Sequence, residues 1–452
     1  MRIFIPLTLL LYILGIQVVP AQDNVWTLED CIDYGIENNI GLKRQMLQTE
    51  SAEANLLKAK LDILPSLNLG SDARIGFGRS IDPVTNLITF KQNLSNSFSL
   101  SSTIQIFNGF ATLNNISANK FMVKAGLEND KVIRNTLIIN IMSSYYQVLY
   151  AKGLEEAAKI QLDLSERQLF RIRKTVDTGR EALSRLYEME SRASEDRLSY
   201  TIARNSSSEA LTNLKQLLQI EPGVVFDVMM PDMENNLIID SSFDTDSVYA
   251  IASQTLPRLK AINYELMAAR RQVAAIQGRI APRLSVGGAL FTGYYKVISE
   301  GVPDQASYSK QLKDNNSQAL FMSLNIPIFN NYSTGREIRL AKNRRDDTEL
   351  RLELEKNALY TEIENVCLNF NRGRDEYSAA LANLEFNRKS FDAVEKKFEA
   401  GIVDVTDYSA AKTTLFRAET ETLRTRLQLH ILDLTIRFYS TGDYETIIKT
   451  QH

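Results

Sequence analysis

The sequence predicts a mostly α-helical chain with a few membrane-spanning β-strands, built from two copies of one unit. Three observations lead to this fold class. Apolar residues alternate with polar ones in four short segments, which is typical of strands with one apolar and one polar face. They recur with helical spacing over much longer segments, which indicates coiled-coil packing. Short motifs also recur at a constant offset, which indicates an internal repeat.

The first 21 residues have the pattern of a secretory signal peptide. A basic start, Met1-Arg2, precedes an apolar run from Ile3 to Val19, and small residues follow before the polar stretch. An uncleaved anchor helix is the alternative, which Pro6 and Pro20 disfavour. We therefore expect an exported mature chain that begins at residue 22 and carries no lipid anchor, because no cysteine follows the cleavage site.

The composition excludes several classes of function. The chain has 452 residues, with 52 Lys plus Arg against 55 Asp plus Glu, two histidines and two cysteines. So few histidines and cysteines leave little material for a metal site, a disulfide scaffold or a nucleophile paired with histidine. The balanced charge argues against a nucleic-acid partner. We expect no enzyme, no cofactor and no metal, and we expect Cys31 and Cys367 to be small buried residues.

Repeated motifs define the two units. The marker Ile106-Phe107-Asn108 recurs 222 positions later as Ile328-Phe329-Asn330, and Thr178-Gly179 recurs at the same offset as Ala400-Gly401. Two further prolines, Pro65 and Pro282, lie 217 positions apart at the start of the alternating segments. We therefore expect a first unit over 22–221, a linker over 222–243 and a second unit over 244–452.

Within each unit, two strands precede two long helices. The alternation predicts strands over 66–78, 96–107, 283–296 and 317–328, each long enough to cross the hydrocarbon layer of a membrane. Four strands cannot close a barrel, and an open sheet in lipid leaves unsatisfied edges, so we expect two or three copies to assemble. The alternative is a soluble four-stranded sheet packed on helices.

Helical spacing predicts one hairpin in each unit, over about 109–221 and 330–440, with turns near 179–184 and 401–406. Gly179 and Gly401 are suited to end the first helix of each hairpin, and Ser184 and Thr406 to cap the second. Upstream of the strands, Thr27 is suited to cap an earlier helix that begins at Leu28.

Together these motifs resemble the TolC-like outer-membrane efflux proteins of Gram-negative bacteria. The resemblance covers essentially the whole mature chain and depends on the opening Trp26-Thr27-Leu28-Glu29-Asp30-Cys31-Ile32, both Ile-Phe-Asn markers and both glycine turns. The loop Phe77 to Pro83 looks like that of Bacteroidetes members. The resemblance implies an outer-membrane homotrimer with a 12-stranded barrel and a 12-helix tunnel through the periplasm. It also implies a periplasmic adaptor protein and, through it, an inner-membrane transporter as partners.

The resemblance also implies functional positions at the two turns. Asp407 matches an aspartate that lines the tunnel constriction, Asp404 either joins that ring or caps its helix, and Arg185 stands where an acidic residue is common. We therefore expect Arg185 to pair with Asp404 or Asp407 and hold the resting state shut. The resemblance also implies that the adaptor contacts further residues of the two turns: Gly179, Leu183, Ser184, Gly401, Val405 and Thr406.

The expected function is that of a passive outer-membrane channel, the exit duct of a tripartite efflux or type I secretion system. The alternative is a periplasmic coiled-coil scaffold or adaptor without a pore. Such adaptors usually carry one hairpin beside small β-domains, whereas this sequence predicts two hairpins and two strand pairs.

Overall fold

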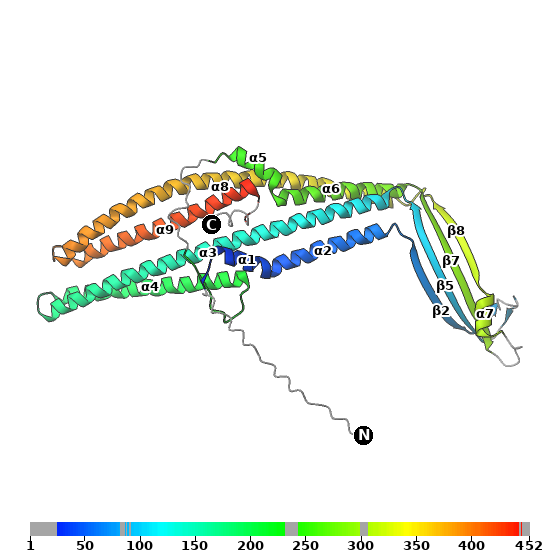
Figure 1. Cartoon of the computed structure of the whole chain (residues 1–452), viewed down its shortest axis with the longest axis horizontal. Coiled ribbons are helices and arrows are strands. Elements are labelled where there is room, and N and C mark those ends of the chain that lie inside the picture. The colour runs from blue at the N-terminus through cyan, green and yellow to red at the C-terminus, as the bar shows by residue number, and fades with distance from the viewer. Residues whose placement is uncertain are drawn as a thin grey trace, which may run out of the picture.

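The computed structural model describes residues 25–81, 86, 88–89, 92–230, 243–298, 306–442 and 444. The predicted signal peptide, 1–21, and residues 231–242 of the predicted linker lie outside the described residues. The molecule is elongated: long helices run side by side, and a sheet projects from one of their ends (Figure 1).

The described chain begins with a short strand, β1 (Val25–Trp26), and two helices, α1 (Leu28–Asn38) and α2 (Ile40–Leu61). The predicted cap of α1 is confirmed. The Thr27 hydroxyl accepts from the Asp30 amide at 3.2 Å, and the Asp30 carboxylate accepts from the Thr27 amide at 2.9 Å. This reciprocal pair is a capping box, which satisfies two amides at the start of the helix.

Strands lie in all four segments where alternation predicted them: β2 (Ser66–Gly76), β5 (Gln92–Phe107), β7 (Arg283–Ile298) and β8 (Ser317–Asn325). They form one antiparallel sheet in the order β2-β5-β7-β8, so that β5 and β7 join the two halves of the chain. Strand β5 begins four residues earlier than predicted. Strand β8 ends before Pro327, which lacks the amide that a further ladder bond needs.

The sheet has one apolar and one polar face. Directly opposite residues of antiparallel strands share a face, and the register aligns Leu69 with Leu100 and Leu100 with Leu290. The residues between them point the other way, and on β5 they form a polar run of Ser95, Ser97, Ser99, Ser101 and Thr103. We call these surfaces the apolar face and the polar face.

A short helix, α7 (Tyr308–Asp314), completes the hydrogen bonding of β7 beyond the start of β8. The buried Gln311 side chain accepts from the Tyr295 amide and donates to the Tyr295 carbonyl, each at 3.0 Å. Asn315 donates to the Gly293 carbonyl at 2.8 Å. On the other side of the sheet's end, β3 (Ser80–Ile81) pairs with β4 (Ile88–Thr89). Neither α7 nor the β3–β4 pair was identified from the sequence.

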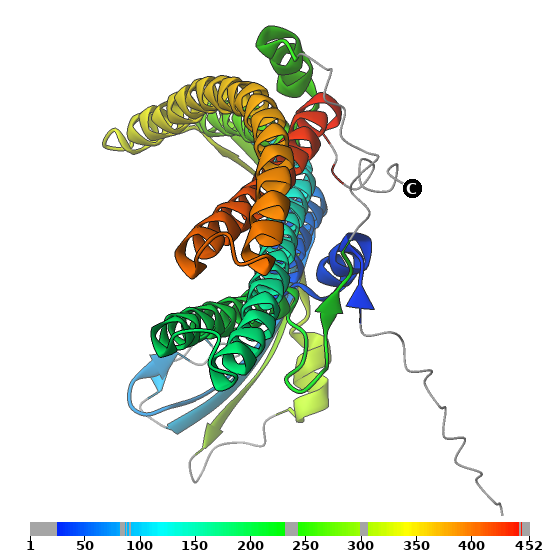
Figure 2. The same cartoon turned by 90° about the vertical axis from the view of Figure 1, so that its left-hand side faces the viewer.

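Two helical hairpins make up most of the length. Helices α3 (Ala111–Asp177) and α8 (Ser333–Glu399) have 67 residues each and therefore reach about 100 Å. Each is followed by a returning helix, α4 (Leu183–Leu218) or α9 (Val405–Thr441). The turns of both hairpins lie beside each other at the end remote from the sheet (Figures 1 and 2).

The Ile-Phe-Asn markers turn the chain from strand into helix. Asn108 donates to the Thr112 hydroxyl at 2.6 Å, and Asn330 donates to the Thr334 hydroxyl at 2.5 Å. The residue that precedes each long helix, Phe110 or Tyr332, is in the left-handed region, with φ near +62° and +64°. The same local solution therefore serves at both markers.

Two helices of the second half, α5 (Thr245–Thr255) and α6 (Pro257–Gln277), were not identified from the sequence. Helix α6 begins with Pro257 at its first position, where the missing amide costs nothing. It continues into a 3₁₀ turn, η1 (Gly278–Ile280). Ion pairs connect α6 and η1 to α8: Arg258 with Glu355 at 2.7 Å, Arg270 with Glu349 at 2.9 Å and, from η1, Arg279 with Glu337 at 2.7 Å.

The main hydrophobic core lies at mid-length, where α1, α3, α5, α8 and α9 meet. Its central side chains are fully or almost fully buried, among them Ile138, Ile141, Leu149, Leu359 and Leu434. Strand β1 pairs in parallel with β6 (Asp227–Val228) beside this core, so residues of the predicted linker take part in the fold. Cys31 and Cys367 are both buried free thiols in this core, as expected.

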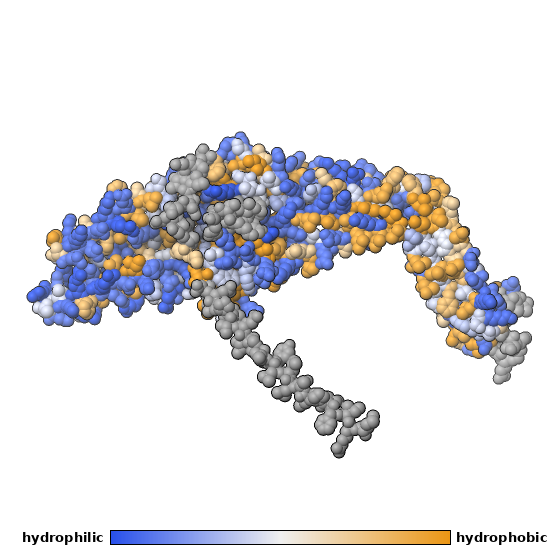
Figure 3. All heavy atoms as spheres, viewed as in Figure 1, coloured by the Kyte–Doolittle hydropathy of each residue, from blue (hydrophilic) through white to orange (hydrophobic). Residues whose placement is uncertain are grey.

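None of the helices in the described part of the chain is long and apolar enough to cross a membrane. Hydrophobic residues gather where the sheet meets the long helices and along the sheet, whereas the hairpin end is mostly hydrophilic (Figure 3). On the apolar face, Leu69 and Leu320 are 78% and 92% exposed in the single chain.

Candidate functional site

The candidate site consists of the two hairpin turns. Gly179 and Gly401 have φ values of +72° and +73°, a region that glycine enters without a steric penalty. In the first turn, the amides of Gly179 and Arg180 donate to the carbonyls of Val176 and Thr175. The corresponding bonds run from Gly401 and Ile402 to Phe398 and Lys397. Both turns are therefore Schellman motifs, and both glycines end their helices as predicted.

Ser184 and Thr406, predicted as caps of the returning helices, lie too late in the sequence, whereas the cap predicted as one of two roles for Asp404 is confirmed. Helix α9 begins at Val405, and the carboxylate of Asp404 accepts from the Asp407 amide at 2.8 Å, so Asp404 is the cap and Thr406 is already helical. Helix α4 begins at Leu183 after an extended Ala182, and no side chain caps it. Ser184 also lies inside its helix. The capping residue is the last extended one, and in each turn that residue is two positions before the predicted hydroxyl.

Arg185 connects the two turns, although not through a carboxylate of the second turn. Its guanidinium donates to the Glu181 carboxylate, four residues earlier, at 2.7 Å and to the Val403 carbonyl of the second turn at 3.3 Å. The expected partners within the chain were Asp404 and Asp407. Asp404 uses its carboxylate as a helix cap, and both aspartates are exposed at the turn.

The residues expected to contact an adaptor differ in their exposure. Leu183 is 58% exposed, and Gly179, Ser184, Gly401 and Thr406 also lie at the surface. Val405 does not: its side chain is 2% exposed. It packs against Ile172 and Met189 of the first hairpin, so its role is to hold the hairpins together.

Several contacts join the hairpins just behind the turns. Arg171 pairs with Glu399 at 3.0 Å, and a cavity of about 120 Å³ lies between the hairpins beside this pair. Tyr408 is fully buried and stacks on Phe398 with ring centroids 4.5 Å apart. Burial raises the pKa of Tyr408 to about 12. The turns therefore rest on a packed layer that includes side chains of both hairpins.

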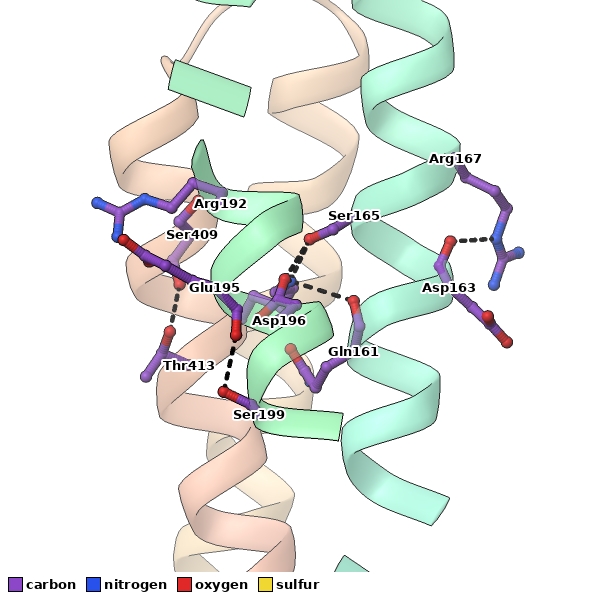
Figure 4. Close-up of polar contacts among 11 residues, drawn as sticks. Gln161, Asp163, Ser165, Arg167, Arg192, Glu195, Asp196, Ser199, Ser409 and Thr413 are labelled. Atoms are coloured by element: carbon purple, nitrogen blue, oxygen red, sulfur yellow. Dashed lines mark hydrogen bonds and ion pairs between the residues drawn. The ribbon is translucent and has the colours of Figure 1, made fainter. Parts of the chain in front are cut away.

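A buried ion pair, which was not predicted from the sequence, lies deeper between the hairpins. Lys412 of α9 is 4% exposed and donates to Asp196 of α4 at 2.6 Å and to the Ser165 hydroxyl of α3 at 2.6 Å. Ser165, Asp196 and the Gln161 carbonyl converge on this point from the first hairpin (Figure 4). Burial lowers the pKa of Lys412, and the hydrogen bond that Lys412 donates to Asp196 opposes that effect.

One sequence signal pointed to this pair. Along α4, mostly apolar residues recur every three or four positions and form a seam that faces other helices. Asp196 occupies a position of this seam between Ala193 and Tyr200, and a buried carboxylate there needs a partner. Nothing in the sequence pattern identified Lys412 as that partner. These polar contacts join α3, α4 and α9 and therefore connect the two hairpins.

The described residues contain little that is suited to bond-making chemistry. No group of three or more His, Cys, Asp or Glu side chains among them is placed to hold a metal ion. His430 is buried among helices, where desolvation lowers its pKa. What the turns do provide is charge: exposed carboxylates of Asp404 and Asp407 and an anchored guanidinium at Arg185.

Comparison with known proteins gives a family. The model of the outer membrane efflux protein family matches residues 32–218 and 248–440, which together include both hairpins and all four long strands. The curated outer membrane protein TolC of Escherichia coli (strain K12) is 20% identical over 405 residues, which cover 88% of this chain and 79% of TolC.

Solved structures show the same fold. The crystal structure of CusC has a TM-score of 0.77 at 16% identity and covers 92% of each chain. The Campylobacter jejuni CmeC outer membrane channel has a TM-score of 0.76 at 16% identity, covering 95% of this chain and 89% of CmeC. The protein is located in the outer membrane, and the chain belongs to the outer membrane efflux protein family.

Proposed function

We propose that three copies of this chain form the exit duct of a tripartite efflux or type I secretion system. In this assembly, three sheets close a 12-stranded barrel in the outer membrane, and the hairpins form a 12-helix tunnel in the periplasm. Each chain contributes two structurally similar units. The duct itself is a passive conduit, and an inner-membrane transporter, reached through a periplasmic adaptor, drives the substrate through it.

The open edges of the sheet support this proposal most strongly. Within the described residues, β2 pairs only with β5 and β8 pairs only with β7, so both outer edges are free. In lipid, every unpaired backbone group costs several kcal/mol. Pairing β8 of one copy with β2 of the next removes this cost and places the exposed leucines of the apolar face against lipid.

The mass of the detergent-solubilised protein tests the assembly. We expect a trimer that migrates as an oligomer in unboiled electrophoresis samples and as a single chain after boiling. The apolar face predicts that extraction requires detergent. A monomer that is soluble in water would contradict the proposal and would favour the periplasmic scaffold without a pore.

We further propose that the turns gate this duct. Three copies of Asp407 around a narrow opening attract cations and repel one another, and Asp404 adds charge nearby. Arg185 holds the resting state by bonding to the second turn of its own chain at the Val403 carbonyl. In the trimer, its charge also faces the acidic ring. Opening requires the hairpins to move apart, against the Arg171–Glu399 pair behind the turns.

The exposed turn residues are the proposed contact for the adaptor. A photo-crosslinking residue at Leu183 should capture the periplasmic adaptor in cells, because Leu183 is 58% exposed at the first turn. The matched control is Val225, which is 70% exposed but lies in the linker, away from the turns. Equal capture at both positions, or capture at Val225 alone, would contradict the proposed contact.

A further inference from the structure

A polar cavity of about 390 Å³ lies where the sheet joins the long helices. Its walls come from β5, α3, α6 and β7. Amide and guanidinium side chains make up most of its lining, among them Gln105, Asn115, Gln272, Arg279 and Arg283.

The cavity opens on the polar face of the sheet. Gln105 pairs with Ser285 in the register of β5 and β7, and Arg283 precedes Ser285 by two residues, so all three share that face. The helical residues continue the same surface, because Gln272 of α6 and Arg279 of η1 both line the cavity.

The charge of the cavity is positive and only partly compensated. Arg279 and Arg283 are the charged side chains of its lining. Arg279 pairs with Glu337 at 2.7 Å. Arg283 forms no ion pair among the residues that the structure describes. One guanidinium is therefore left for a ligand, with amide donors beside it.

The backbone fixes the shape of this cavity. Gly109 and Gly278 cross so closely that a Cβ added to Gly109 would lie 2.2 Å from the Gly278 carbonyl oxygen. A Cβ on Gly278 would lie 2.3 Å from the Gly109 carbonyl oxygen. Since α3 begins just after Gly109 and β7 begins soon after Gly278, this crossing sets the distance between the cavity walls. The site exists before any ligand binds, which reduces the cost of ordering it.

We propose that this cavity binds anionic groups, phosphate or carboxylate, of the molecules that pass through the duct. Arg283 is the principal contact, because a guanidinium presents paired donors that match the oxygens of both groups. Arg279 adds charge, and the amides of Gln272 and Asn115 add neutral donors. The position of the site in the transport path depends on the proposed function, whereas its affinity for anions depends only on one chain.

Isothermal titration of the purified protein in neutral detergent with inorganic pyrophosphate tests the site. We expect saturable binding of one pyrophosphate per chain. Arg283→Gln should weaken binding about tenfold, since it removes a charge-assisted contact. Gln272→Ala should weaken it less. The matched control is Arg74→Gln, which removes an arginine from the polar face of β2, far from the cavity, and should leave affinity unchanged.

Absence of binding in the natural sequence, or equal affinity in Arg283→Gln, would overturn the proposed site. Equal loss in Arg74→Gln would also overturn it, because binding would then follow net charge. Channel conductance, measured on the same preparations, separates this inference from the proposed function. If the protein binds pyrophosphate but forms no channel, the proposed duct is refuted and the anion site is supported. If it forms a channel but does not bind pyrophosphate, the anion site is refuted and the duct is supported.

Discussion

The two hairpins have the same backbone plan, yet they differ in the side chains that connect them. Their long helices have equal lengths, and their turns have the same Schellman hydrogen bonds and nearly equal glycine φ values. Many pairs of residues related by the 222-residue offset differ in charge, among them Ala182 and Asp404, Arg185 and Asp407, Glu190 and Lys412, and Asp196 and Ala418.

These differences follow from the contact between the hairpins. Lys412 reaches into the first hairpin to meet Asp196, whereas its counterpart Glu190 pairs with Arg173 inside that hairpin. Arg185 bonds to the second turn, whereas its counterpart Asp407 remains exposed. The hydrogen bonds of the turns and their glycines therefore give both hairpins the same backbone geometry. Side chains at the contact are free to diverge, because each bond needs its donor on only one hairpin.

Breaking the buried pair should have the largest effect on stability. Asp196→Ala leaves the charge of Lys412 buried and without its carboxylate, which should lower the free energy of unfolding by about 3 kcal/mol. Lys412→Met removes the buried charge and keeps the volume, so the loss should be smaller. Urea denaturation of the purified protein measures both. Equal, small losses would show that the hairpins do not depend on this bond.

Alkaline pH should reveal a difference between the two hairpins at the position of Tyr408. Tyr408 corresponds to Leu186 of the first hairpin, which cannot ionise. The pKa of Tyr408 is raised to about 12 in the folded chain, so its contribution is complete below pH 10 and is lost as pH rises toward 12. The loss amounts to about 2 kcal/mol. In a plot of the free energy of unfolding against pH, Tyr408→Phe should lack the part of the alkaline slope that corresponds to one proton. Equal slopes for the variant and the natural protein would contradict this expectation.

The shared backbone predicts equal effects at the two turn glycines. Gly179→Ala and Gly401→Ala should each cost about 1 kcal/mol, because both positions are left-handed. Gly373→Ala is the matched control. It lies in the right-handed α8, where a Cβ would make an ordinary contact with Leu432 at 3.5 Å, so it should be neutral or stabilising. Thermal denaturation followed by circular dichroism compares the three, and unequal losses at the two turns would contradict a common geometry.

The caps give the smallest difference. Asp404→Ala should cost about 1 kcal/mol, whereas Ser184→Ala and Thr406→Ala should change stability by less than about 0.5 kcal/mol. Ala182→Asp should stabilise the first turn by providing the cap that it lacks. The same thermal measurement applies. A large effect at Ser184 or Thr406 would restore the caps predicted from the sequence.

The sequence predicted features that depend on local periodicity. Strand alternation located all four long strands, and the glycines located both turns, because these signals arise from residues close together in the chain. The same reasoning placed the Thr27 cap correctly. Ser184 and Thr406, also predicted as caps, lie two residues too late. Their hydroxyls are suited to capping, but the length of the turn decides which residue is the last extended one before the helix.

Contacts between distant segments could not be predicted from one sequence. Lys412 and Asp196 are separated by 216 positions, and only the odd placement of a carboxylate on a seam pointed to their bond. The burial of Val405 and the bond from Arg185 to a carbonyl likewise depend on how the hairpins pack. Helix α7 was missed because its role, completing the edge of β7, appears only in the sheet.

Single-channel conductance in planar bilayers shows whether the hairpin turns gate an outer-membrane channel. We expect the natural protein to form a channel that is held narrow at the hairpin turns. Arg185→Ala and Asp407→Ala should each increase its conductance, and Asp407→Ala should also reduce its preference for cations. Glu195→Gln, an exposed carboxylate of α4 away from the turns, should change neither property. Absence of any channel, or conductance in both turn variants equal to that of the natural protein, would contradict the account.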